Sequence, residues 1–299
     1  MIAGGDEGKL HLLDKSLLQI RSTYVGACLH AGIVVGDYVY VSVKNDSYKL
    51  QVFELSTFKL LHSYAIPFQV IKFIKASYCK QLYIICVLQN GALQMLNTTT
   101  NQIDSKLKLF IGKEYITDFI RSDREHQYFY TADNVFGLCE IKSTKNDNKF
   151  KLNLLKKYTY QEEGFITSVK RIASQKYLLT FFERTLQLIL FDSKKRCFKT
   201  ISKTKPHHVS EFCIQKKPNR AFNSNPFILL KNGKILSVFN QYTMEELQIY
   251  NSPYSISDFN FYTMVVDDSK EDKVIINSLI NSDVVRQYSI SYEQIGNLM

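Results

Sequence analysis

The sequence predicts an all-β protein, and three observations support this fold class. Residues that favour strands are abundant: the 299 residues include 19 Tyr and 20 Phe, against 12 Gly and 5 Pro. Short apolar runs alternate with turn sequences, such as the Gln-Asn-Gly of residues 89–91. These runs also recur at a regular spacing along the chain, which indicates a repeat protein. A single domain covering residues 1–299 is predicted, because all-β domains reach this length.

The repeating unit has an apolar first strand, a loop, two strands joined by a turn, and a more polar fourth strand. Six candidate first strands begin near residues 27, 69, 115, 165, 208 and 255, at intervals of 42, 46, 50, 43 and 47 residues. This spacing is close to the period of roughly 40–45 residues expected for four-stranded propeller blades. The sequence therefore predicts a single seven-bladed β-propeller of four-stranded antiparallel blades.

The strands that follow each first strand have the composition that such blades require. Two apolar runs flank a turn in each of the ranges 81–97, 176–192 and 226–240. Many of these runs are apolar at consecutive positions, as expected for strands packed on both faces between neighbouring blades. The fourth strands, such as those predicted within 149–159 and 197–204, are more polar and suit an outer edge.

The first blade is incomplete, because residues 1–25 supply only three strands. The innermost strand is missing, and two explanations stay open. The segment YEQIGNLM at 292–299 could supply the missing strand and close the ring, since an open ring would expose strand edges. Alternatively, the natural protein extends upstream of Met1. The second explanation is favoured, because 292–299 also fits the outer strand of the seventh blade.

The segment IAGGDEGKLHLLD at residues 2–14 resembles the middle of a WD40 repeat, where a Gly-rich turn precedes a strand that ends in a bulky residue and Asp. LQLILFD, ending at Asp192, is a second and weaker match. The chain is thus similar to a degenerate WD40-repeat-like β-propeller. It departs from that pattern in having no Trp and no Gly-His pair at the start of a repeat. The resemblance implies a scaffold function, since WD40-type propellers mainly hold proteins together.

No catalytic, cofactor or metal site is predicted. The sequence GGDEGK lacks the glycine and hydroxyl positions of a phosphate-binding loop and is expected to be a hairpin turn. The remaining candidates match no known metal or acid–base spacing and are expected to be structural or solvated: the group His207, His208 and Cys213, the pair Glu162 and Glu163, and the acidic run at 267–272. The six cysteines are expected to act as small core residues.

Polar residues recur near the same place in four predicted first strands. We expect them to form hydrogen bonds around a central channel or to satisfy neighbouring backbone groups; they are Asp118, Ser168, Ser210 and Ser257.

The excess positive charge of the chain is concentrated in one region. Residues 140–220 contain 19 Lys or Arg and 7 Asp or Glu, whereas the rest of the chain contains 19 and 21. Antiparallel strand order places loops between third and fourth strands, and loops between first and second strands, on the same face of a blade. A basic arc is therefore predicted from Lys145, Lys149, Lys194, Lys195, Arg196, Lys216, Lys217 and Arg220.

Two interpretations of this arc stay open. It could bind an acidic protein segment or a nucleic-acid backbone, or it could reflect the codon bias of an AT-rich coding sequence. The favoured function is a non-catalytic scaffold that binds other protein subunits of a larger complex. The alternative is a subunit that contacts RNA or DNA. No membrane span is predicted, and an intracellular location, cytoplasmic or nuclear, is expected.

Overall fold

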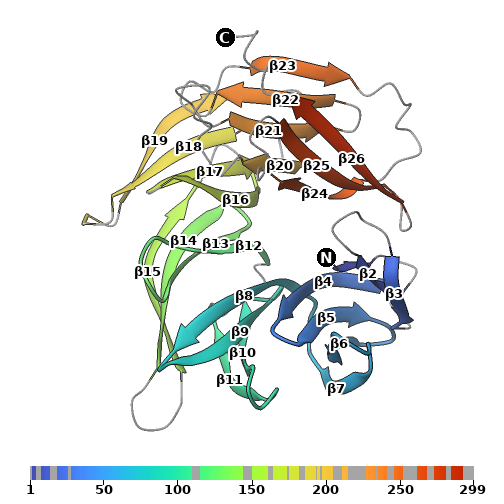
Figure 1. The fold of residues 1–299 in the computed structure, drawn as a ribbon. Coiled ribbons are helices and arrows are strands. Elements are labelled where there is room, and N and C mark those ends of the chain that lie inside the picture. The colour runs from blue at the N-terminus through green and yellow to red at the C-terminus, as the bar shows by residue number, and fades with distance from the viewer. Residues whose placement is uncertain are drawn as a thin grey trace. The chain divides into compact units, whose positions relative to one another are not determined.

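Every element in the described part of the computed structural model is a β-strand (Figure 1). No helix in this part is long and apolar enough to cross a membrane. After Thr200 only the backbone is described. The described residues are 2–4, 8–13, 19–25, 28–109, 115–143, 150–160, 164–173, 175–181, 186–192, 194–195, 197–204, 211–214, 227–232, 235–240, 246–251, 261–267, 273–280 and 284–291.

The strands form antiparallel sheets that follow one another along the chain, numbered here as sheets 1 to 7. Sheet 1 has three described strands: β1 (Ile2–Gly4), β2 (Lys9–Leu13) and β3 (Gln19–Tyr24). Sheet 2 contains β4 (Cys28–Val35), β5 (Tyr38–Lys44), β6 (Tyr48–Glu54) and β7 (Leu60–Ala65). Sheet 3 contains β8 (Val70–Tyr78), β9 (Gln81–Leu88), β10 (Ala92–Asn97) and β11 (Ile103–Lys108). Sheet 4 contains β12 (Ile116–Arg121), β13 (Gln127–Ala132), β14 (Val135–Ser143) and β15 (Phe150–Thr159).

Sheets 5 to 7 repeat the pattern. Sheet 5 contains β16 (Ile166–Ala173), β17 (Lys176–Phe181), β18 (Leu186–Asp192) and β19 (Cys197–Thr204). Sheet 6 contains β20 (Glu211–Ile214), β21 (Phe227–Asn232), β22 (Ile235–Asn240) and β23 (Glu246–Asn251). Sheet 7 has three described strands: β24 (Phe261–Asp267), β25 (Lys273–Ile280) and β26 (Val284–Ser291). The chain divides into two compact units, Met1–Val169 and Lys170–Met299.

The predicted repeat of four antiparallel strands is confirmed in sheets 2 to 6, whereas the predicted first-strand starts near residues 208 and 255 lie outside the described residues. The first strands of sheets 2 to 5 begin within one residue of the predicted positions, at Cys28, Val70, Ile116 and Ile166. Among the described residues, sheet 1 has three strands, as predicted. The segment 292–299 lies outside the described residues, so its role in closing the ring stays a prediction.

The sheets share an irregularity that supports a common repeat. In every described pair of third and fourth strands, the register shifts by one residue, as between Leu138 and Cys139 in sheet 4. Such β-bulges leave one residue of the outer strand without a partner and increase the local twist. In the first strands of sheets 2, 3 and 4 a second bulge is present, and the residues after it are Ala31, Lys72 and Asp118.

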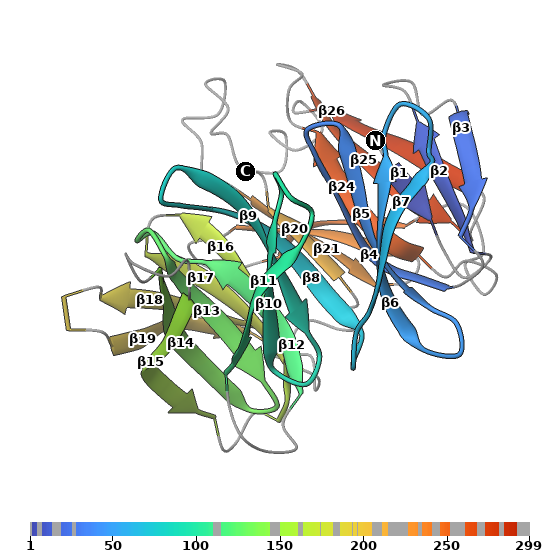
Figure 2. The same cartoon turned by 90° about the horizontal axis from the view of Figure 1, so that it is seen from below.

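The middle strands of sheet 3 are buried on both faces because this sheet packs against both sheet 2 and sheet 4. In β9, Tyr83, Ile85 and Val87 belong to the cluster shared with sheet 4. The alternating residues Ile84, Cys86 and Leu88 belong to the cluster shared with sheet 2. Figure 2 shows β8 to β11 between the strands of these two sheets, and β8 contacts both β4 and β12. This arrangement explains the consecutive apolar residues of the second and third strands.

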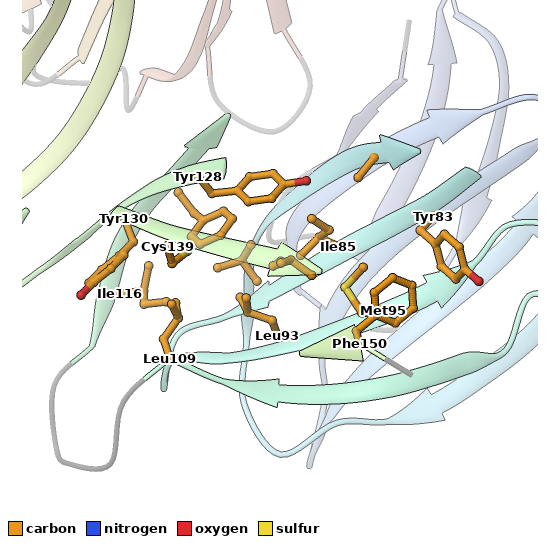
Figure 3. Packing of buried hydrophobic residues seen from close by; sticks show 14 of the residues in the cluster. Tyr83, Ile85, Leu93, Met95, Leu109, Ile116, Tyr128, Tyr130, Cys139 and Phe150 are labelled. Carbon is orange, nitrogen blue, oxygen red and sulfur yellow. The ribbon is translucent and has the colours of Figure 1, made fainter. Parts of the chain in front are cut away.

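The cluster between sheets 3 and 4 contains several large aromatic residues (Figure 3). The Tyr78 and Tyr128 hydroxyls are 3.0 Å apart and hydrogen bonded, which satisfies two buried polar groups at once. A Cβ atom added to Gly137 would lie 2.1 Å from Cζ of Tyr130, so the tyrosine ring occupies the space of the missing side chain.

Candidate interaction surfaces

The turn between β18 and β19 presents the two described lysines of the predicted basic arc. Asp192 Oδ1 accepts hydrogen bonds from the backbone N–H groups of Lys194 and Lys195, at 2.9 and 3.0 Å. These bonds, the one from Lys195 above all, lower the pKa of the Asp192 carboxyl group. The turn is thereby ordered by the Asp that ends the third strand, while both lysines are exposed to solvent.

The other six arc residues lie outside the described residues: Lys145, Lys149, Arg196, Lys216, Lys217 and Arg220. The connections that carry them are nevertheless of the predicted types. Residues 144–149 and 193–196 each join a third strand to a fourth, and residues 215–226 join a first strand to a second. A single arc formed by all three connections stays a prediction.

Asp118 performs the structural role expected for the recurrent polar residues. Its Oδ1 atom is paired with Nζ of Lys72 in β8 and accepts the Phe119 N–H at 2.8 Å. Its Oδ2 atom accepts the N–H of Val169 in β16 at 3.0 Å. One carboxylate therefore joins the first strands of sheets 3, 4 and 5. Ser210 and Ser257 lie outside the described residues.

Thr117, beside Asp118, also forms hydrogen bonds that connect β12 with β13 and with the start of β16. Its hydroxyl donates a hydrogen bond of 2.7 Å to the carbonyl of Ile166 and lies 2.7 Å from the hydroxyl of Thr131. The Ile166 N–H in turn donates to the carbonyl of Asp133 at 2.6 Å. Side-chain and backbone bonds thus connect β12 and the turn after β13 to the start of β16.

Several large apolar side chains are exposed in the first unit. Tyr115 and Phe165 immediately precede β12 and β16 and are 49% and 57% exposed. On the outer strands, Ile20 and Leu154 are 61% and 55% exposed. Scattered exposed apolar residues are normal, but equivalent positions in neighbouring sheets are candidates for protein contact.

The described residues contain no cluster of His, Cys, Asp or Glu that could hold a metal ion. Glu162, Glu163, His207 and His208 lie outside them. Cys86 and Cys139 are buried, which confirms that these two are core residues, and their burial raises the pKa of both thiols. The prediction was wrong for Cys79, which is exposed in the two-residue turn between β8 and β9.

Two features were missed in the sequence. The outer strand β11 has an alternating pattern that exposes Lys106 and Lys108, which could have been found in the sequence IDSKLK. In addition, the third strands of sheets 2 and 3 end in Phe53–Glu54 and Leu96–Asn97. Asn97 Oδ1 accepts the Thr99 N–H at 2.9 Å. In these two sheets, Glu or Asn after a bulky residue therefore takes the place of the Asp that ends the corresponding strand of a WD40 repeat.

No protein-family model matches the sequence, and no curated protein matches it. Solved structures match well in fold. The structure of BBS1N in complex with ARL6DN has a TM-score of 0.67 and 8% identity, covering 96% of this chain and 85% of that chain. The Cps50 (Swd1) β-propeller domain of Myceliophteria thermophila has a TM-score of 0.67 and 9% identity, covering 97% and 93%. With its succession of antiparallel four-stranded sheets, the chain therefore has a WD40-like β-propeller fold.

Proposed function

We propose that this protein is a non-catalytic scaffold that binds other protein subunits within an intracellular complex. The observation that carries the proposal is the propeller fold, which extends over almost the whole chain. A succession of antiparallel sheets presents many loops and outer strands for independent contacts. The propeller BBS1N has a structure in complex with ARL6DN, which is a precedent for protein binding by this fold.

Affinity purification with and without nuclease tests the proposal. A scaffold is expected to retain the same protein partners after nuclease treatment. Loss of all partners after nuclease would overturn the scaffold function. Turnover of a substrate by the purified chain would contradict the non-catalytic assignment.

The charge distribution favours a second candidate, contact with nucleic acid through the predicted arc. Residues 140–220 carry an excess of 12 positive charges, and Lys194 and Lys195 are exposed on an ordered turn. The test is charge reversal to Glu at Lys194, Lys195, Arg196, Lys216, Lys217 and Arg220.

If the arc binds phosphates, the reversal variant should melt at nearly the same temperature but lose nucleic-acid affinity. The loss of six phosphate contacts should flatten the slope of log affinity against log salt by roughly four to five. Unchanged binding of every co-purifying partner would show that the arc is only a solvated surface.

A further inference from the structure

The outer strands of sheets 1 and 2 turn some of their side chains toward each other. In β3, Arg21 and Thr23 pair in register with Leu12 and Leu10 of β2. Both leucines pack on the apolar cluster between sheets 1 and 2. Residues directly opposite each other in an antiparallel pair share a face, so Arg21 and Thr23 are on the face of sheet 1 toward sheet 2.

β7 supplies the facing residues of sheet 2. Leu60 pairs with Phe53, a member of the same cluster, so Leu60 is on the face toward sheet 1. Ser63 pairs with Gln51, and Gln51 pairs with Val41, which also belongs to this cluster. The two sets of residues together are called here the β3–β7 surface: Arg21, Thr23, Gln51, Leu60 and Ser63.

Arg21 is held beside the connection that leads into β7. Its Nη1 atom donates a hydrogen bond to the carbonyl of Ser56. The Glu54 N–H donates to the carbonyl of Lys59 at 3.0 Å, which closes this connection into a tight loop directly before Leu60. Arg21 is exposed, and the ion pairs between described residues do not include it. A guanidinium group has five N–H donors in a fixed fork, so the bond to Ser56 leaves donors for a carboxylate.

Two further features of the β3–β7 surface point to a ligand. Gln51 Oε1 is buried and has no hydrogen-bond partner among the described residues, which is costly unless a donor reaches it. Leu60 is an aliphatic residue that is 46% exposed. Glu54, the acidic residue of the loop before β7, pairs with Tyr38, which packs toward sheet 3, so Glu54 is on the opposite face. The surface therefore combines a cation, an acceptor without a donor and an exposed apolar side chain.

Larger side chains occupy the corresponding position between the following sheets. Counted from the bulge of the outer strand, Thr23 is equivalent to Tyr64 in β7 and to Leu107 in β11. Tyr64 donates a hydrogen bond to the carbonyl of Asn101 in sheet 3, and Leu107 packs on the cluster between sheets 3 and 4. Between sheets 1 and 2 the residues are Thr23 and Ser63, so short polar side chains line this part of the surface.

We propose that the β3–β7 surface binds an acidic segment of a partner protein, with a carboxylate on Arg21, a backbone N–H group at Gln51 Oε1 and an apolar side chain on Leu60. Charge complementarity favours an acidic partner, because Arg21 has donors left and Glu54 is on the other face. A phosphate backbone would also contact Arg21, but it carries neither an N–H donor for Gln51 nor an aliphatic side chain for Leu60. This inference rests on the proposed scaffold function and specifies one of its binding surfaces.

The test uses the full chain and a fluorescein-labelled peptide, Gly-Asp-Glu-Leu-Glu-Asp-Gly, in fluorescence anisotropy. Arg21→Glu should lower peptide affinity at least tenfold, whereas Arg124→Glu, the same charge change at an exposed arginine of sheet 4, should leave it unchanged. Leu60→Asp should also lower the affinity at least tenfold, whereas Leu154→Asp, at the equivalent and 55% exposed position of β15, should not. Replacing the peptide leucine by Ser should weaken binding to the wild type but not to Leu60→Asp, and this comparison on the wild type does not depend on a variant that folds.

Gln51→Met separates a binding role of Gln51 from a structural one. The substitution removes a buried acceptor that has no partner among the described residues, so the melting temperature should not fall. Peptide affinity should fall severalfold, because the peptide N–H group loses its acceptor. A lower melting temperature with unchanged peptide affinity would overturn the assignment of Gln51 to this surface.

Several results would overturn the proposal. One is equal peptide affinity for Arg21→Glu and its matched control Arg124→Glu. Another is tighter binding of a labelled single-stranded oligonucleotide that depends on Arg21 and is insensitive to Leu60→Asp, which would assign the surface to nucleic acid. If protein partners survive nuclease but bind Arg21→Glu normally, the proposal for this surface fails while the scaffold function stands.

Discussion

In sheets 3 and 4, Lys72 and Asp118 of the first strands form an ion pair between the two sheets, whereas the lysines of the outer strands β11 and β15 are exposed. Asp118 is 7% exposed and holds groups from three strands. The exposed lysines of the outer strands are Lys106 and Lys108 in β11 and Lys151, Lys156 and Lys157 in β15. Charged residues therefore join sheets at the inner edge, whereas at the outer edge they are exposed to solvent.

Asp118→Ala should cause the largest loss of stability, because it acts at the inner edge of sheets 3 and 4. The substitution leaves Lys72 without its partner and removes the acceptor of two buried N–H groups. Removing one partner of a buried pair costs about 3–5 kcal/mol, and about 3 kcal/mol is expected because Lys72 is partly exposed. Urea unfolding measures the loss. Asp118→Asn, which keeps an acceptor oxygen, should lose less, and equal losses for both variants would contradict the role of the N–H bonds.

Gly137→Ala should have the next largest effect, through packing rather than charge. The new methyl group would overlap the ring of Tyr130, which is itself 3% exposed and cannot move aside freely. Overpacking of this kind costs about 1–3 kcal/mol. In a Tyr130→Leu background, which removes the overlapping ring atoms, the cost of Gly137→Ala should fall. An unchanged cost in this double-mutant cycle would show that the ring is not the obstacle.

Alkaline pH should also lower the free energy of unfolding, through the buried tyrosine Tyr40. Burial, followed by the effect of Tyr38, raises the pKa of Tyr40 from 10.0 to about 12, and its hydroxyl donates to Asn101 Oδ1 at 2.7 Å. Between these two pH values the unfolded chain releases a proton that the folded chain keeps, so stability is full below pH 10 and falls toward pH 12. The fall attributable to Tyr40 is on the order of 1–2 kcal/mol.

Chemical denaturation of the wild type and Tyr40→Phe at pH 9 to 12 measures this contribution. Tyr40→Phe is expected to be less stable at pH 9, because it lacks the bond to Asn101, but to lose less stability as the pH rises. Parallel curves for the two proteins would show that Tyr40 does not titrate differently in the folded state.

The difference between the two edges also explains what the sequence could predict. Blade positions follow from apolar periodicity, so β12 and β16 were located within one residue of their observed starts. The arrangement of exposed lysines on the surface is harder to predict, because lysines carried by loops do not recur at a regular spacing in the sequence. Lys106 and Lys108 do alternate along β11, but the proximity of β11 to β15 depends on long-range packing of Leu107 and Leu152. The sheets joined by Asp118 likewise become evident only from the fold.

The smallest effect on stability is expected for the exposed lysines of the outer strand β15. Lys151→Ala, Lys156→Ala and Lys157→Ala should each change the free energy of unfolding by less than about 0.5 kcal/mol, since exposed charges contribute little. At low ionic strength the triple variant should be slightly more stable than the wild type, because like charges repel one another along β15. In 0.5 M salt, where the screening length falls to a few ångströms, this gain should disappear. Denaturation at the two salt concentrations distinguishes the outcomes. A salt-independent loss of stability near that of Asp118→Ala would show that these three lysines make a large contribution to the free energy of unfolding.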